Sequence, residues 1–240
     1  MKNITNKVAY VTGGSKGIGY GVAELLMKEG VNVVLTSRSE EAAKKAADNL
    51  NGKSLVGKAV GVKADVRSLE AQQKAIAAAN EHFGPVDYVI ANAGVGHFAS
   101  IDELTADQWQ DTIDINLTGV FNSVKAGLDD LKKTEGYLIT IASLAGTNFF
   151  AKGSAYNASK FGLVGFTQAV MMDVRQHGVK VSTIMPGSVA THFNDHQPGP
   201  EDAWKIQSED IGQIVVDLIK MPARVLPSKV EVRPSMPPSK

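Results

Sequence analysis

The stretch TGGSKGIG, residues 12–19, lies between a short β-rich run and an amphipathic run, and it decides how the fold is interpreted. Glycines at 13, 17 and 19 allow the backbone to turn tightly and to come close to a ligand. The N–H groups at the start of the following helix would point at a phosphate. Because the spacing is G-x-x-x-G-x-G rather than G-x-G-x-x-G, a phosphate turn and a purely structural turn both remain open at this point.

Strand-like and helix-like segments alternate along the whole chain. Between the β-rich runs lie longer amphipathic stretches such as IGYGVAELLMKEG, residues 18–30, which Gly30 is expected to end. This alternation predicts a Rossmann-like, doubly wound α/β fold, with a mostly parallel seven-stranded sheet, helices on both faces, and ligands at the carboxyl ends of the strands. The seven predicted strands begin near Lys7, Val31, Lys58, Val86, Tyr137, Val179 and Val230.

Length and composition indicate one domain with small-molecule partners. The 240 residues suit a single α/β domain, residues 1–240, whose Pro-rich tail at about 234–240 we expect to be frayed. The 25 basic and 25 acidic residues cancel without a basic block, which argues against nucleic acid as a partner. No apolar run approaches the ~18 residues of a membrane span, and the start of the chain lacks a signal-peptide core. We therefore expect a cytoplasmic protein that does not enter a membrane.

Metal and thiol chemistry find little support in the sequence. The chain has no cysteine, which excludes disulfides, thiol nucleophiles and zinc-thiolate sites. His192 and His196 have i,i+4 spacing, but the segment lacks the Glu of an H-E-x-x-H motif and is followed by QPGP. We expect a loop there and no metal site.

The residues after the second predicted strand favour NADP(H) over NAD(H). An NAD-binding protein places an acidic residue there for the ribose 2′-hydroxyl, whereas this chain has Ser37 and Arg38. A guanidinium can make two parallel hydrogen bonds to a 2′-phosphate, and Lys16 in the glycine turn adds a second cation. The alternative is that Arg38 only opens a helix into solvent.

The stretch YNASK, residues 156–160, sets a phenol and an ammonium four residues apart. On a helix, Tyr156 and Lys160 then project from the same face, one turn apart. Two interpretations are open for this pattern alone: an exposed helical face, or a catalytic acid held beside a cation.

Seven motifs follow one another along the chain: TGGSKGIG at 12, DV at 65, NAG at 92, Asn116 in INLTG, Ser143 in IASLAG, YNASK at 156 and PGSVAT at 186. With these motifs in order, the chain resembles the short-chain dehydrogenases/reductases from about Lys7 to Arg233, in the branch of NADP(H)-preferring carbonyl and 3-oxoacyl reductases. Many members end in a strand followed by DGG, whereas this chain ends VEVRPSMPPSK, so the C-terminal wall of the substrate site is not inherited.

The resemblance implies a role for each matching residue. The catalytic set would be Asn116, Ser143, Tyr156 and Lys160, with Asn116 in a locally irregular helix and Lys160 also on the nicotinamide ribose. Asp65 and Val66 would hold the adenine. The full set of expected cofactor-binding residues is Gly13, Ser15, Lys16, Gly17, Ile18, Gly19, Ser37, Arg38, Asp65, Val66, Asn92, Ala93, Gly94, Tyr156, Lys160, Pro186, Gly187, Val189 and Thr191.

Elementary chemistry fits these roles. Hydride delivery to a carbonyl builds negative charge on oxygen, so Tyr156 would give the proton while Ser143 donates a hydrogen bond to that oxygen. An ammonium about 5 Å away, at an effective dielectric of about 20, contributes about 3 kcal/mol, or about two pKa units. We therefore expect Lys160 to lower the pKa of the Tyr156 phenol.

The predicted function is reduction of a ketone or aldehyde with NADPH, including a 3-oxoacyl thioester as a candidate substrate. Phe98, Phe149, Phe150, Phe193 and Trp204 fall in segments that border the expected carbonyl site, which suggests an apolar or aromatic substrate. The short segment from His192 to Gln207 predicts a small lid. A cofactor-binding sensor without turnover is the alternative from another class, and the complete Ser143, Tyr156 and Lys160 set argues against it.

The expected assembly is a homotetramer, as in many relatives of the family. The helices around Asn116 and Tyr156 would form one interface. Gly162 and Gly165, in FGLVGF, would permit the close approach of a partner helix.

Overall fold

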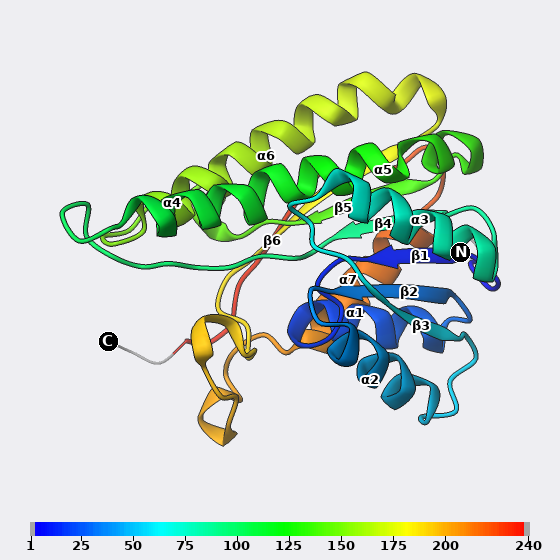
Figure 1. Cartoon of the computed structure of the whole chain (residues 1–240), viewed down its shortest axis with the longest axis horizontal. Coiled ribbons are helices and arrows are strands. Elements are labelled where there is room, and N and C mark those ends of the chain that lie inside the picture. The colour runs from blue at the N-terminus through cyan, green and yellow to red at the C-terminus, as the bar shows by residue number, and fades with distance from the viewer. Residues whose placement is uncertain (1–2, 238–240) are drawn as a thin grey trace.

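The computed structural model describes residues 3–237, so the last three residues of the tail predicted to fray lie outside the described part. All seven strands pair in parallel in one sheet, in the order β3-β2-β1-β4-β5-β6-β7 (Figure 1). The predicted fold class is therefore confirmed. The strands are β1 (Val8–Val11), β2 (Asn32–Ser37), β3 (Ala59–Lys63), β4 (Tyr88–Ala91), β5 (Tyr137–Ile141), β6 (Lys180–Pro186) and β7 (Lys229–Val232).

Alternating side chains of each central strand enter two separate cores. In β2, Val33 and Leu35 pack into the core beneath α1, α2 and α7, whereas Val34 packs into the core beneath α3, α5 and α6. A strand whose side chains are buried on both faces is apolar along its whole length, as the short β-rich runs of the sequence indicate. The helices are α1 (Gly17–Lys28), α2 (Glu40–Asn51), α3 (Leu69–Phe83), α4 (Ala106–Ile113), α5 (Gly119–Thr134), α6 (Ser154–Val174) and α7 (Ser208–Lys220).

Local side chains fix several helix starts. The Ser39 hydroxyl accepts a hydrogen bond from the Ala42 N–H at the start of α2, and the Ser68 hydroxyl accepts one from the Ala71 N–H at the start of α3. A π-helix, Asp114–Thr118, joins α4 to α5. At the end of α1, Gly30 has φ +81°, which confirms the predicted stop.

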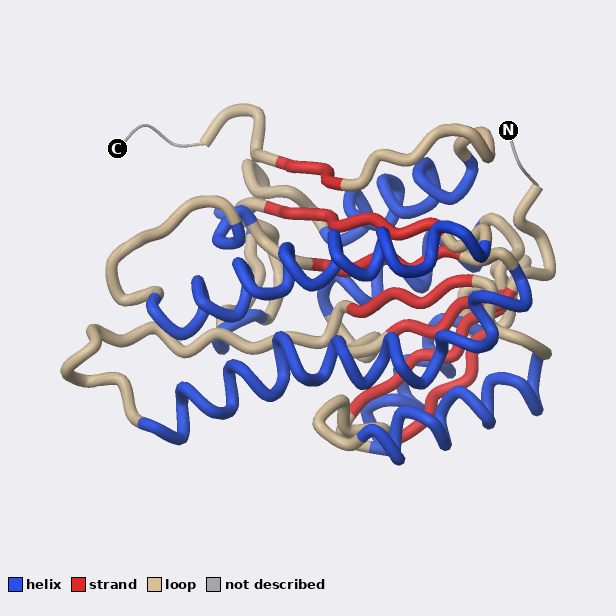
Figure 2. Tube along the Cα trace, turned by 90° about the horizontal axis from the view of Figure 1, so that it is seen from above, coloured by secondary structure: helices blue, strands red, loops and turns tan. Residues whose placement is uncertain are grey.

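The long loops gather at the carboxyl ends of the strands (Figure 2). The loop after β1 and the loop after β4 meet there because the strand order reverses between these two neighbours. Short 3₁₀ turns, Leu144–Gly146 after β5 and Phe193–Asp195 and Pro200–Asp202 after β6, lie in the same region. Among residues 3–237, no helix has the length and apolarity that crossing a membrane requires.

Candidate active site

The glycine turn adopts a backbone that only small residues permit. Gly13 and Gly17 have φ of +64° and +57°. Gly19 is required for another reason, because a Cβ there would lie 2.5 Å from both the Asn92 Nδ2 and the Gly13 carbonyl oxygen. No side chain caps the start of α1, so its first N–H groups are available to an anion.

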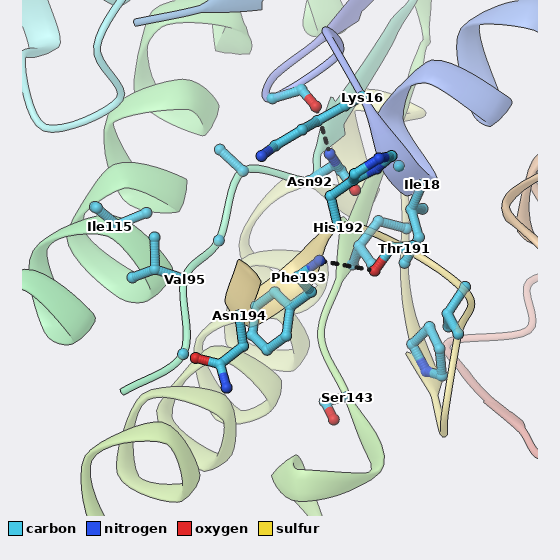
Figure 3. Close-up of a pocket in the computed structure, with 18 of the residues that line it drawn as sticks. Lys16, Ile18, Asn92, Val95, Ile115, Ser143, Thr191, His192, Phe193 and Asn194 are labelled. Carbon is cyan, nitrogen blue, oxygen red and sulfur yellow. Dashed lines mark hydrogen bonds between the residues drawn. The ribbon is translucent and has the colours of Figure 1, made fainter. Parts of the chain in front are cut away.

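The turn after β1 is bound to the NAG loop after β4 through Thr12 and Asn92. The Asn92 amide donates to the carbonyl oxygens of Thr12 and Gly13, at 2.9 and 3.1 Å. The Thr12 hydroxyl accepts hydrogen bonds from the N–H groups of Asn92 and Ala93, at 3.0 and 3.2 Å. Asn92 therefore shapes the phosphate turn as well as lining the cavity (Figure 3).

A single cavity of about 720 Å³ runs past this turn to the tyrosine and lysine of α6. Its size and its cradle of glycines and uncapped N–H groups fit a dinucleotide. Three of the expected site residues, Gly19, Asp65 and Asn116, do not line it. The expected residues that do line it are Gly13, Ser15, Lys16, Gly17, Ile18, Ser37, Arg38, Val66, Asn92, Ala93, Gly94, Ser143, Tyr156, Lys160, Pro186, Gly187, Val189 and Thr191.

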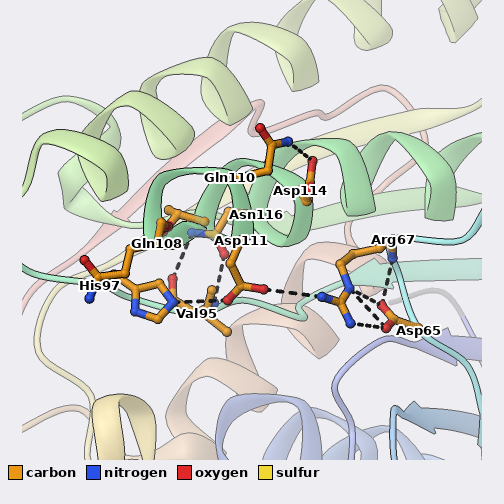
Figure 4. Close-up of polar contacts among 10 residues, drawn as sticks. Asp65, Arg67, Val95, His97, Gln108, Gln110, Asp111, Asp114 and Asn116 are labelled. Atoms are coloured by element: carbon orange, nitrogen blue, oxygen red, sulfur yellow. Dashed lines mark hydrogen bonds and ion pairs between the residues drawn. The ribbon is translucent and has the colours of Figure 1, made fainter. Parts of the chain in front are cut away.

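Asp65 is engaged by a neighbour that the sequence interpretation overlooked. Arg67 donates to both carboxylate oxygens of Asp65, at 2.6 to 3.1 Å, and these hydrogen bonds lower the pKa of Asp65. Arg67 also reaches Asp111 at 3.4 Å, and Asp111 pairs with the His97 Nε2 at 3.1 Å (Figure 4). This chain of polar contacts links the end of β3 to the loop after β4. The adenine contact expected of Asp65 stays a prediction.

Asn116 lies in the π-helix, which confirms the expectation of a locally irregular helix. Its side chain is fully buried, accepts from the Val95 N–H at 2.8 Å, and donates to the Val95 carbonyl and the Ser159 hydroxyl. These contacts fix the loop after β4 against α6. A Cβ on Gly94 would lie 3.3 Å from the Asn116 Oδ1 and 3.7 Å from the Lys160 Nζ, so the two side chains are close together.

Ser143, Tyr156 and Lys160 converge at the ends of β5 and α6. The Ser143 hydroxyl accepts from the Ala145 N–H at 3.1 Å, which fixes its orientation at the start of a 3₁₀ turn. The Lys160 Nζ donates to the Ile141 carbonyl at 3.2 Å and lies 5.6 Å from the centroid of the Tyr156 ring. The same-face geometry predicted from YNASK is therefore present.

The structure corrects the expected pKa of the phenol. Removal of the hydroxyl from water raises the pKa of Tyr156 above its ordinary value, and a hydrogen bond with Ser143 opposes this increase only in part. Lys160 is itself buried, and burial lowers its pKa to about 8. The sequence indicates the attraction between the Tyr156 phenol and the Lys160 ammonium, but it does not reveal that both groups are removed from water.

Two phenylalanines lie against the Tyr156 ring, and a third lies against one of them. The centroids of Phe98 and Phe193 lie 5.4 and 5.7 Å from that of Tyr156, and Phe150 lies 5.9 Å from Phe98. The two other aromatic residues suggested for this region make no ring contact with this group among the described residues. Phe149 is 87% exposed, and the Trp204 ring lies 5.8 Å from the Lys205 ammonium.

The segment of residues 192–207, here called the lid segment, is held by a buried carboxylate. Asp202 accepts hydrogen bonds from the Lys205 Nζ and the His196 Nε2, both at 2.5 Å, and from the Gly199 N–H at 3.2 Å. The contacts to Lys205 and then His196 lower the pKa of Asp202 to about 2. His196 hydrogen-bonds to Asp202 and follows a short 3₁₀ turn, Phe193–Asp195.

Several cavity residues were not predicted from the sequence, whereas Phe193, expected beside the carbonyl site, does line the cavity. Among the unpredicted residues, His97 was the most accessible to prediction, because it lies in a loop that follows a strand end. The others lack a motif of their own. The unpredicted lining residues are Ala64, Val95, Gly96, His97, Ile115, Ile141, Ala142, Ser188, His192, Asn194, His196 and Lys205.

Comparison with known proteins gives consistent results. Residues 7–201 match the family model described as short chain dehydrogenase. The chain is 34% identical over 235 residues to an uncharacterized oxidoreductase of Staphylococcus aureus strain MW2, covering 98% of this chain and 100% of that protein. It is 34% identical over 192 residues to the trans-4-hydroxycyclohexanecarboxylate dehydrogenase of Sinomonas cyclohexanicum, covering 78% of this chain and 74% of that protein.

Among solved structures, the chain is similar to an alcohol dehydrogenase from the archaeon Thermococcus sibiricus complexed with 5-hydroxy-NADP. The TM-score is 0.88 at 29% sequence identity, and the match covers 98% of this chain and 99% of that chain.

The parallel sheet, the phosphate turn and the Ser143, Tyr156 and Lys160 set define an oxidoreductase of the dinucleotide-binding α/β class. The match to the family model and the similarity to the Staphylococcus aureus oxidoreductase identify the family: the chain belongs to the short-chain dehydrogenases. It is therefore an oxidoreductase that acts on CH–OH groups with a nicotinamide cofactor.

Proposed function

We propose that this protein is an NADPH-dependent reductase that converts a ketone or an aldehyde into an alcohol. The observation that carries the proposal is the position of Ser143, Tyr156 and Lys160 on the same cavity as the glycine turn. A proton donor beside a phosphate cradle serves turnover, whereas a sensor that only binds the cofactor has no use for it.

The chain's own residues supply the acid chemistry. When bound, a dihydronicotinamide would provide the hydride. The Ser143 hydroxyl would donate a hydrogen bond to the substrate oxygen while Tyr156 donates the proton. The raised pKa keeps the phenol protonated at neutral pH, which suits reduction rather than oxidation.

Lys160 would replace the proton that Tyr156 gives up. Its pKa of about 8 leaves the ammonium charged at pH 7 but able to release a proton at modest cost. Asn116, close to Lys160, would mark the place where a water returns protons from solvent. The same ammonium would bind the nicotinamide ribose.

Three side chains support the choice of NADPH. Lys16, Ser37 and Arg38 all line the cavity, and Arg38 follows the end of β2 directly. Two charge-assisted contacts of about 1.5–3 kcal/mol each would give a preference on the order of 100-fold or more. The related dehydrogenase with 5-hydroxy-NADP bound supports this choice by its likeness in fold.

The first experiment measures binding of NADPH and NADH by fluorescence and then screens a panel of carbonyl compounds for oxidation of the preferred cofactor. Reduction of at least one ketone or aldehyde with NADPH is expected. Binding of the cofactor without turnover of any carbonyl would support the sensor instead.

Replacement of Ser37, the last residue of β2, together with Arg38, which follows it, tests the phosphate site. Ser37→Asp with Arg38→Leu should reverse the preference, since a carboxylate repels the 2′-phosphate and accepts from a ribose hydroxyl. The measurement is kcat/KM for both cofactors at one ionic strength. A parent that favours NADH, or a double variant that still strongly favours NADPH, would contradict this assignment.

We also propose that the protein forms a homotetramer in the cytoplasm. Phe121 of α5 and Phe161 of α6 are 46% and 44% exposed, and a Cβ on Gly165 would meet no atom within 4 Å. This open, apolar surface on two adjacent helices suits a second copy of the chain. Light scattering at micromolar concentration should give four times the mass of the chain, and a monomer would contradict the proposal.

A further inference from the structure

Three exposed rings form one connected group beside Tyr156, because Phe98 and Phe193 contact Tyr156 and Phe150 contacts Phe98. Phe98, Phe150 and Phe193 are 39%, 48% and 37% exposed, although each has an aromatic neighbour within 6.3 Å. Together with the Tyr156 ring they form what is here called the aromatic seat. Large apolar side chains that gather on a surface beside a reactive group mark a place where an apolar ligand is bound.

The rings come from three separate segments. Phe98 lies on the loop after β4, Phe150 between β5 and α6, and Phe193 on the lid segment. Figure 3 shows Phe193 projecting into the pocket between the loop of Val95 and the segment of Thr191. The seat therefore depends on the way the loops close over the carboxyl edge of the sheet.

Gly96 provides the floor of the seat. A Cβ at this position would lie 2.6 Å from the Cζ of Phe193 and 2.9 Å from the Cζ of Phe98. Gly96 is not among the glycines with positive φ, so space rather than backbone conformation requires it. Any larger residue would therefore force the two rings to move.

We propose that the aromatic seat binds the planar ring of an aryl ketone or aryl aldehyde, with Gly96 and Phe193 as the residues that determine this specificity. The inference rests on the proposed function and decides between the substrate classes that it leaves open. Edge-to-face contacts at centroid distances of 4.5–7 Å favour a flat aromatic partner. A flexible acyl chain loses more conformational freedom in such a place than a rigid ring does.

The lid segment also disfavours a 3-oxoacyl thioester on a phosphate-bearing carrier. His196 and Lys205 line the cavity, but both already bind the buried carboxylate of Asp202. His196 and Lys205 therefore hold the lid segment and do not offer a free cation to a carrier phosphate.

The test compares acetophenone and benzaldehyde with hexanal and acetoacetyl-coenzyme A as substrates, each with the preferred cofactor. The parent should show a kcat/KM at least about tenfold higher for the aryl compounds. Phe193→Leu and Phe150→Leu should each lower the aryl value about tenfold and lower the hexanal value by a smaller factor. Phe149→Leu is the matched control, because its ring is 87% exposed and lies outside the seat.

Gly96→Ala should lower the aryl value at least as much as Phe193→Leu does, and its melting temperature shows whether the fold is retained. Two results would overturn the proposal: a kcat/KM for hexanal or the thioester equal to that for the aryl compounds, or an equal loss in Phe149→Leu. If no carbonyl is reduced at all, the proposed function fails separately. Saturation-transfer NMR then tests whether acetophenone binds in the aromatic seat. Its ring protons should receive saturation from the parent and from Phe149→Leu, but much less from Phe193→Leu. Equal transfer in all three proteins would refute the proposal.

Discussion

The wall of the cavity that follows β1 and β4 is held by side-chain amides that bind backbone groups, whereas the wall that carries the lid segment is held mainly by side chains that bind one another. Asn92 binds the carbonyl oxygens of Thr12 and Gly13, and Asn116 binds both backbone groups of Val95. Across the cavity, Asp202 holds the lid through His196 and Lys205, and the rings of the seat stay partly exposed. We therefore expect the first wall to fit one ligand shape. We expect substitution of a few side chains in the second wall to change which substrates bind.

Tyr156 stands where the two walls meet, so its replacement should have the largest effect. We expect Tyr156→Phe to lower kcat/KM by about two to four orders of magnitude with cofactor affinity almost unchanged, because only the proton donor is lost. Steady-state rates and fluorescence titration measure the two quantities. Tyr20→Phe, which removes a phenol on α1, serves as the control, and near-full activity in Tyr156→Phe would refute the mechanism.

Lys160 lies on α6 beside Gly94 of the first wall, and its replacement should affect binding and turnover together. Lys160→Met should lower kcat about 10²-fold and weaken NADPH binding as well, because one ammonium serves both the phenol and the ribose. Lys125→Met, at an exposed position of α5, is the matched control. Unchanged cofactor affinity would contradict a contact between the Lys160 ammonium and the nicotinamide ribose.

The same variant should be more stable than the parent at pH 7. The pKa of Lys160 is lowered from 10.5 to about 8 in the folded protein. Between pH 8 and pH 10.5 the unfolded chain therefore binds more protons at Lys160 than the folded protein does. The stability of the parent rises with pH across that range. Below pH 8 the cost of the buried charge is fully present, at about 3 kcal/mol. Thermal melts without cofactor should show Lys160→Met above the parent at pH 7, with the gap closing toward pH 10.5. A gap independent of pH would contradict the buried charge.

The lid wall should respond more weakly and in KM alone. Asp202→Asn releases the contacts of Lys205 and His196, so Phe193 is less well fixed, and we expect KM for the carbonyl to rise about tenfold with a smaller change in cofactor affinity. Asp217→Asn, at an exposed position of α7, is the control. A change in cofactor affinity larger than the change in KM would show that the lid belongs to the cofactor wall.

The contrast between the walls also explains what the sequence could predict. The strands, the end of α1 and the phosphate turn follow from local rules, because apolar runs and glycines that need positive φ can be recognised within ten residues. The shared face of Tyr156 and Lys160 follows from helix geometry. The match of Asn116 to an irregular helix came from the family resemblance rather than from local rules.

The remaining features depend on residues that meet only after folding. The contact of Phe193 and Phe98 over Gly96 joins two loops nearly 100 positions apart, and no spacing in the sequence indicates it. The engagement of Asp65 by Arg67 has a local signal, an acid and a base two residues apart, but the link onward to Asp111 and His97 does not. The raised pKa of Tyr156 depends on burial, which the pattern YNASK does not reveal.

The most direct test of the central claim follows the hydride itself. The protein is incubated with acetophenone and NADPH that carries deuterium at the transferable C4 position, and the product is examined by mass spectrometry and NMR. We expect the parent to form 1-phenylethanol of one configuration with one deuterium on the carbinol carbon. We expect Tyr156→Phe to form none that can be detected over the same time. Recovery of unreacted ketone from the parent across the carbonyl panel, or an alcohol without deuterium, would contradict it.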